Sequence, residues 1–170
     1  MSCGKIFEES GLLFDFSASE SAYVADKPNY PGLSAVDFVV EIPHEILFIE
    51  VKNPDSFRAL EHGQRRDFIR KMSLDLFPIK MSAKFKDSIL KELAAGRKFV
   101  KPIKYILLLE CGEIDPKQRS TLLQRINGKV PKFSENGYSS VSKISVAVYN
   151  RKEFLNEYTD FKIIVLEETE

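Results

Sequence analysis

Two carboxylates and a lysine stand close together in two apolar runs of the sequence. Asp37 lies in the first run, Ser34 to Ile42, and Glu50 and Lys52 lie in the second, Ile46 to Lys52. Carboxylate oxygens are ligands that Mg²⁺ prefers, together with water and substrate phosphate. An ammonium group beside them can hold a water molecule or stabilise charge on a phosphate oxygen. These residue types indicate metal-assisted hydrolysis of a phosphate ester.

The spacing of the two runs predicts an antiparallel hairpin. Only Pro43-His44-Glu45 separates them, which is too short for a parallel crossover. In a symmetric hairpin Asp37 lies directly opposite Glu50, with Cβ atoms about 4.5–5.5 Å apart, and alternation places Lys52 on the same face. Because Pro43 cannot adopt the positive φ of a tight hairpin turn, a longer loop is expected. A loop of odd length would shift the register by one and separate the carboxylates.

The simplest alternative is a solvated strand face on which Lys52 is the counter-ion of Asp37 and Glu50. Both runs, however, are apolar on both faces, as expected for strands that are covered by helices and do not face water. Opposed carboxylates in such strands repel each other unless one is protonated or a cation lies between them. A metal-free pair with one protonated carboxyl needs an apolar pocket, of which the sequence gives no sign. We therefore favour a site for Mg²⁺, with Mn²⁺ as a substitute.

Asp37, twelve intervening residues and then Glu50-Val51-Lys52 resemble the PD-(D/E)XK nuclease superfamily, also called restriction-endonuclease-like. The matching part, Val36 to Lys52 with the helix and buried strand that follow, covers about the central half of the chain. The resemblance implies an α/β fold with a restriction-endonuclease-like core (αβββαβ), in which helices flank a central mixed sheet. It also implies Mg²⁺-dependent hydrolysis of phosphodiester bonds. Asp37, Glu50 and the Val51 carbonyl would bind the metal, and Lys52 would assist the attacking water.

Two further features depend on this resemblance. The family's first helix often carries another acidic ligand, for which Glu8, Glu9 and Glu20 compete; Glu20 is favoured. Gln64 and Phe68 resemble the Gln-x-x-x-Tyr motif of RecB-type members, with Phe in place of Tyr. Independently, Gln64 interrupts the apolar stripe of a helix, which predicts that it faces the sheet near the lysine. A glutamine at the edge of an ordinary amphipathic helix explains it equally well.

The overall charge is zero, with 25 basic and 25 acidic side chains, which argues against strong indiscriminate binding to nucleic acid. The charges are nevertheless segregated: residues 1–57 have a net charge of −7, residues 58–104 of +8, and residues 105–170 of −1. The basic segment predicts a phosphate-contacting surface, with Arg65, Arg66 and Lys84 as candidates. Solvated helix faces are the alternative explanation for each of these side chains.

Strand and helix signals alternate along the chain, which predicts a single α/β domain over residues 1–170. Helices are expected from residue 55 or 56 to Pro78, over 80–95 and 117–127, and as shorter pieces within 8–10, 18–25 and 153–158. Beyond the hairpin, strands are expected over 11–17, 103–110, 144–149 and 161–166.

Several classes of protein are excluded by what the sequence lacks. It has no phosphate-binding loop, no dinucleotide-binding glycine pattern and no Gly-x-Ser-x-Gly elbow. Its apolar runs are too short to span a bilayer, and its N-terminus does not resemble a signal peptide. Cys3 and Cys111 form no metal-binding pattern and are expected to be reduced thiols. A cytoplasmic protein is predicted.

Two functions follow from these patterns. The leading prediction is a nuclease that cleaves DNA, with RNA left open, and in which Gln64 assists the core site. The alternative is an inactive module that has kept the nuclease fold and binds nucleic acid or a protein partner. Sequence specificity, the choice between endonuclease and exonuclease action, and dimerisation stay open.

Overall fold

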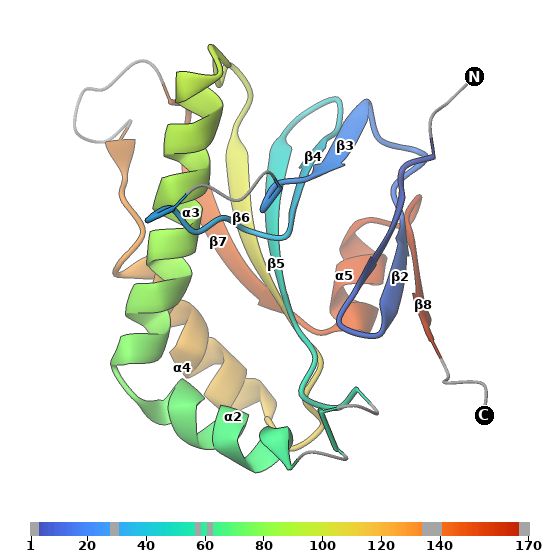
Figure 1. The fold of residues 1–170 in the computed structure, drawn as a ribbon, viewed down its shortest axis with the longest axis vertical. Helices are drawn as coiled ribbons and strands as arrows, with labels where there is room; N and C mark the ends of the chain where they lie inside the picture. The colour runs from blue at the N-terminus through green and yellow to red at the C-terminus, as the bar shows by residue number, and fades with distance from the viewer. Residues whose placement is uncertain (1–3, 28–30, 57–58, 61–62, 134–140, 167–170) are drawn as a thin grey trace.

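The computed structural model describes residues 4–27, 31–56, 59–60, 63–133 and 141–166. The protein is α/β, with a five-stranded mixed sheet and a three-stranded antiparallel sheet (Figure 1). The larger sheet has the order β3 (Ser21–Val24), β4 (Phe38–Glu41), β5 (Ile46–Lys52), β6 (Ile103–Leu109) and β7 (Ile144–Tyr149). The smaller sheet has the order β1 (Ile6–Glu9), β2 (Leu12–Asp15) and β8 (Lys162–Val165). The described residues also form four helices: α2 (Gln64–Ser73), α3 (Leu76–Ala94), α4 (Pro116–Asn127) and α5 (Arg151–Glu157).

The larger sheet changes from antiparallel to parallel pairing at β5. The strands β3, β4 and β5 are antiparallel neighbours, whereas β6 lies parallel to β5 and β7 lies parallel to β6. Parallel neighbours need a crossover, and here α2 and α3 connect β5 to β6 while α4 connects β6 to β7. The central strand β5 is buried along its length except at Lys52.

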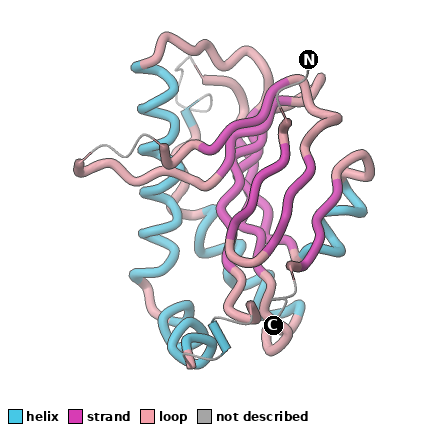
Figure 2. The backbone as a smooth tube through the Cα atoms, turned by 45° about the vertical axis from the view of Figure 1, so that its right-hand side comes forward, coloured by secondary structure: helices cyan, strands magenta, loops and turns pink. Residues whose placement is uncertain are grey.

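Each face of the larger sheet packs against a different layer. One face, with Val39 and Phe48, packs against α2, α3 and α4. The other face, with Phe38 and Ile49, packs against the smaller sheet and α5, so that the two layers lie on opposite sides of the sheet (Figures 1 and 2). The hairpin is therefore covered on both faces, but the expected cover by helices is found on one face only, because the smaller sheet together with α5 covers the other.

Local capping signals mark the starts of α4 and α5, whereas α2 and α3 begin without a side-chain cap, and α2 begins at Gln64 and not at residue 55 or 56. Asp115 caps α4 through the backbone N–H of Gln118, as the Asp-Pro pair before the helix predicts. Pro78, expected to end the first long helix, instead lies in the first turn of α3, where its missing N–H is not needed. The break lies at Leu74, which has extended backbone. No helix among the described residues is long and apolar enough to cross a membrane.

The N-terminal residues differ from the prediction. The helices expected within 8–10 and 18–25 are wrong, because Glu8 and Glu9 belong to β1 and Ser21–Val24 forms β3. Ser10 and Gly11 have positive φ values of 52° and 75°, which form the tight turn between β1 and β2. The described residues before β3 form no helix, and the smaller sheet together with α5 covers one face of the larger sheet.

Candidate active site

The β4–β5 hairpin has the predicted register. Phe38 pairs with Ile49 and Glu41 with Ile46, so the same ladder, continued by one residue, places Asp37 opposite Glu50. The backbone N–H of Ile42 donates to the carbonyl of Glu45 at 3.0 Å, which keeps an even number of residues in the connection. The two carboxylates therefore share the face that packs against the helices.

Glu50 is fully buried and forms ion pairs with two lysine side chains. Lys84 Nζ, from α3, lies 2.7 Å from one carboxylate oxygen and 3.0 Å from the other. Lys52 Nζ donates to Glu50 Oε1 and, at 3.1 Å, to the carbonyl of Val51. Burial by itself would lower the pKa of Lys84, but the Glu50 carboxylate raises it. Two cations thus compensate a charge that would otherwise be costly to bury.

Asp37 is held differently, although it is only 8% exposed. Its Oδ2 accepts a hydrogen bond of 2.7 Å from the backbone N–H of Val51. Among the described residues, no side chain donates to it. Burial and the nearby Glu50 carboxylate raise the pKa of Asp37 to about 7, against the smaller opposing effects of the Val51 N–H, Lys84 and Lys52. Near neutral pH, this carboxyl is poised between its two protonation states.

Helix α3 fixes the chain just before Asp37. Ser88 Oγ accepts from the backbone N–H of Val36 at 2.9 Å. Asp87 Oδ2 accepts from the backbone N–H and the hydroxyl of Ser34 at 2.9 and 3.0 Å. One helix thus supplies Lys84 to the site and also holds the segment that presents Asp37.

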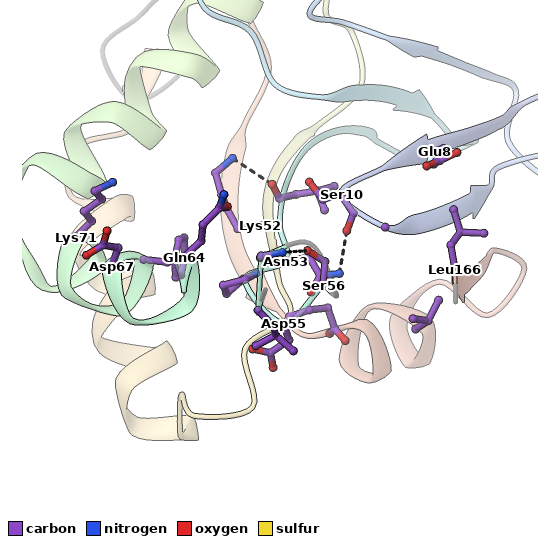
Figure 3. Close-up of a pocket in the computed structure, with 18 residues that line it drawn as sticks. Glu8, Ser10, Lys52, Asn53, Asp55, Ser56, Gln64, Asp67, Lys71 and Leu166 are labelled. Carbon is purple, nitrogen blue, oxygen red and sulfur yellow. Dashed lines mark hydrogen bonds between the residues drawn. The ribbon is translucent and has the colours of Figure 1, made fainter. Parts of the chain in front are cut away.

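Lys52 lies on the wall of an open pocket of about 1470 Å³ (Figure 3). Gln64 and Lys71 from α2 line the same pocket, and Glu8 lines it from β1. Asp37 and Glu50 are not on its wall, but Lys52, which lines the pocket, donates to Glu50 and so links the pocket to the buried carboxylate.

Three other carboxylates on the pocket wall already have cationic partners. Asp55 Oδ1 lies 2.9 Å from Arg65 Nε, and Asp67 pairs with Arg70 at 3.4 Å. Glu110 accepts from the backbone N–H of Arg151 and also lies 3.9 Å from its guanidinium. These pairs reduce the repulsion that an approaching phosphate would meet.

The structure does not bring Glu20 to the site. Glu20 lies at the opposite end of β4 from Asp37, where its backbone N–H donates to the carbonyl of Glu41 and its carboxylate pairs with Lys101. The expectation of a ligand there came from a helix that the described residues do not form. Of the competing acids, Glu8 is the one that lines the pocket beside Lys52.

The predicted phosphate-contacting residues have three different environments. Arg65 is held between Asp55 and Glu113, at 2.9 and 3.3 Å, and links the loop after β5 to the loop after β6. Lys84 faces Glu50 instead of solvent. Arg66 is exposed on α2, as a phosphate contact requires. The structure thus leaves one of the three candidates on the open surface.

Gln64 and Phe68 occupy the first turns of α2. Gln64 lines the pocket with Lys52, but it is exposed and does not pack against the sheet as predicted. Phe68 packs edge-on against Phe77, with ring centroids 5.6 Å apart. The phenylalanine of this motif therefore packs against the core while also lining the pocket.

Sequence reasoning missed the contact between Lys84 and Glu50. The signal was present, because Met81, Phe85 and Ser88 recur at helical spacing and are buried, which turns this stretch of α3 toward the sheet. What the sequence could not show is which buried group lies opposite Lys84.

The oxygen atoms at this site are of the type that Mg²⁺ prefers. The Asp37 and Glu50 carboxylates and the Val51 carbonyl are hard donors, and two ammonium groups already compensate the charge that a metal ion would compensate. The described residues contain no cluster of three or more His, Cys, Asp or Glu side chains suited to a metal ion. A cation would therefore have two acidic ligands, with water and the carbonyl completing its shell.

Comparison of the chain with protein-family models, curated proteins and solved structures gives no match. The site's geometry and the topology must therefore carry the functional argument.

Proposed function

We propose that this protein is a Mg²⁺-dependent nuclease of the restriction-endonuclease-like fold that hydrolyses phosphodiester bonds in DNA. The observation that carries the proposal is the buried opposition of Asp37 and Glu50 across the β4–β5 hairpin, with Lys52 beside them. Strained electrostatics of this kind are costly for folding and cluster at functional sites. Lys52 and Lys84 balance Glu50, but Asp37 has no cationic hydrogen-bond partner among the described residues, which a purely structural pair would be expected to have.

The topology supports the same proposal. Three antiparallel strands are followed by helices and then by a parallel strand, which is the order αβββαβ without its first helix. Asp37 precedes β4 and Glu50 lies near the end of β5, next to Val51 and Lys52, which line the pocket.

Each residue then has a defined part in the chemistry. Asp37, Glu50 and the Val51 carbonyl would hold Mg²⁺, which when bound supplies Lewis-acid polarisation of the phosphate and a more acidic water. Lys52 would orient the attacking water and stabilise charge on a phosphate oxygen. Gln64, on the same pocket wall, would position the substrate, and Arg66 would contact a phosphate farther along.

Lys84 has a part that the sequence did not indicate. Because its ammonium group neutralises Glu50 in the absence of metal, a divalent cation has to displace it or share Glu50 with it. Replacement of Lys84 by methionine is therefore expected to increase the affinity for Mn²⁺, measured by calorimetry without substrate.

The proposal is tested with purified protein, Mg²⁺ or Mn²⁺, and single- and double-stranded DNA, with RNA in parallel. Cleavage is expected with the metal, and Lys52→Ala should abolish it while the circular dichroism spectrum stays unchanged. Lys117→Ala, which removes an exposed lysine on α4, is the matched control and should cleave normally. Cleavage that persists in EDTA would refute the metal requirement and favour a metal-free carboxyl pair.

A second candidate is an inactive module with the same fold that binds nucleic acid. The complete burial of Glu50 and its two lysine partners favour it, because the charges are already balanced without a metal ion. Binding of DNA without cleavage, together with no detectable Mn²⁺ binding by either the wild type or Lys84→Met, would select this function.

A further inference from the structure

A row of exposed aliphatic side chains runs along the outer side of α3. Leu76, Ile79, Leu90 and Leu93 are 54%, 46%, 53% and 39% exposed, respectively. With Ala83 and Lys86 between them, these residues alternate in steps of three and four, which is the spacing of a helix-pairing seam. The opposite side of the same helix, with Met81 and Phe85, is buried against the sheet. The helix therefore has a second apolar face that the described residues leave exposed.

We propose that α3 pairs in antiparallel orientation with α3 of a second copy of this chain. The row is symmetric about the midpoint between residues 84 and 85. In an antiparallel pair, Leu76 faces Leu93 of the second copy, Ile79 faces Leu90, and Ala83 faces Lys86. Every large aliphatic side chain then meets another, and the two-fold axis generates each of these pairings twice. Such a self-complementary patch gives a closed dimer.

The charges beside the row fit the same arrangement. Lys80 and Asp87 lie on one flank of the seam, seven residues apart, and the antiparallel pair brings Lys80 of each copy beside Asp87 of the other. Ser34 donates to Asp87 only at Oδ2, which leaves the other carboxylate oxygen for this contact. Two such Lys80–Asp87 pairs form across the axis, so the two identical surfaces are complementary in charge.

The central residues select the antiparallel orientation. A parallel pair in register would place Lys86 against Lys86 within the seam, where like charges repel. In the antiparallel pair Lys86 meets the small side chain of Ala83, so its aliphatic stem can lie along the seam while the ammonium group reaches water.

Two polar contacts flank the aliphatic row. Ser34 donates to Asp87 on one flank, and Ser82 donates to the Lys129 carbonyl at 2.6 Å on the other flank. By helical spacing, the aliphatic row lies between these two contacts, on the side of α3 opposite the buried Met81 and Phe85. With 19 residues, α3 is about 28 Å long at 1.5 Å per residue, so all layers of the row can be engaged at once.

The first test is sedimentation equilibrium of the full chain over increasing protein concentration. The wild type is expected to dimerise, and Leu90→Glu should weaken the dimer by more than about tenfold, equivalent to about 1.4 kcal/mol. Val100→Glu is the matched control, since Val100 is 82% exposed but lies beyond α3. A wild type that stays monomeric, or a dimer that Leu90→Glu leaves unchanged, would overturn the proposal.

The orientation is tested by disulfide crosslinking in a Cys3→Ser background; Cys111 is buried. A mixture of Ile79→Cys and Leu90→Cys proteins is expected to form mixed crosslinked dimers upon mild oxidation. Each variant alone should crosslink poorly. Efficient self-crosslinking of each variant alone would indicate a parallel pair and overturn the antiparallel arrangement. The result does not depend on nuclease activity.

Discussion

The two ends of β4 hold acidic residues on the same face of the sheet, yet in opposite electrostatic environments. Glu41 receives Arg97 at 2.6 Å and Lys101 at 2.9 Å, and the hydrogen bond from Lys101 lowers its pKa. Asp37, four residues earlier, has no cationic hydrogen-bond partner among the described residues, and its pKa rises to about 7 because it is buried beside Glu50. Glu41 therefore stabilises the hairpin in its charged form, whereas the charged form of Asp37 is costly.

This difference distinguishes a carboxylate that is paired with cations from one that is not. The Glu41 network also includes Tyr23 and Glu92, both of which contact Arg97. At the other end, α3 supplies a lysine to Glu50 but none at hydrogen-bonding distance to Asp37. The Asp37 end is thus the one with capacity for another cation.

The largest expected difference between the two ends is in catalysis. Glu50→Gln should reduce metal-dependent cleavage by at least about 100-fold, because it removes a charged ligand while keeping the shape of the side chain. Glu41→Gln should leave cleavage unchanged. The measurement is the initial rate of DNA cleavage with Mg²⁺. Equal losses in the two variants would remove the functional distinction between the ends of β4.

The next difference is in stability. Glu50→Ala leaves two partly buried ammonium groups without their partner, and we expect a loss of about 3 kcal/mol in the free energy of unfolding. Glu41→Ala removes partly exposed ion pairs and should cost about 1 kcal/mol or less. Urea unfolding in EDTA at neutral pH measures both. If Glu50→Ala lowers the free energy of unfolding no more than Glu41→Ala does, the two lysines are readily solvated without Glu50, and the buried cluster contributes little to stability.

The pH dependence should also differ in sign. In the folded protein Asp37 binds its proton more tightly than in the unfolded chain, so its contribution to stability is greatest below pH about 4 and is lost as the pH rises through about 7. Glu41 does the reverse, because its pKa is lowered: its contribution is lost as the pH falls through its folded-state pKa.

Asp37→Asn isolates the contribution of Asp37 in metal-free buffer. In the wild type, ionisation of Asp37 is expected to lower the free energy of unfolding between about pH 4 and 7. In Asp37→Asn this contribution to the decline should be absent. Urea unfolding at a series of pH values provides the measurement, with Glu41→Gln as the matched comparison. An unchanged pH profile in Asp37→Asn would show that this carboxyl does not titrate in that range.

The smallest effect is expected at Glu20. Its half-exposed carboxylate pairs with Lys101 at the far end of β4, so Glu20→Gln should cost about 0.5 kcal/mol or less. Mn²⁺ affinity, measured by calorimetry, should stay at the wild-type value. A clear loss of Mn²⁺ binding would assign Glu20 to the metal site despite its position.

The hairpin was predictable from the sequence because its geometry is local. Alternating side chains and a short connection leave few registers, and β5 spans Ile46–Lys52 as expected. The strands β6 and β7 and the helix α4 are likewise marked by apolar runs, by the Asp115-Pro116 cap and by Gly128. For the same reason the opposition of Asp37 and Glu50 was within reach of sequence reasoning.

The N-terminal region was not predictable because strand pairing decides its structure. Leu12 pairs with Val165, and Phe14 pairs with Ile163, across nearly the whole length of the chain. Short segments such as 8–10 carry too little local preference to decide between helix and strand, and pairing of β1 with β2 decides it. The expected helix within 18–25, and with it Glu20 as a ligand, failed because Ser21–Val24 pairs with β4.

The sequence by itself determined the hairpin, its register and the face that Asp37, Glu50 and Lys52 share, because these depend on two-residue alternation and a short connection. Only the tertiary structure decided that Lys84 neutralises Glu50, that Arg65 is tied to Asp55, and that Asp37 is buried without a cation of its own. The Arg65–Asp55 pair joins residues 10 apart in the chain, and the Lys84–Glu50 pair joins residues 34 apart. Their formation depends on how α2 and α3 pack on the sheet, which no local pattern specifies.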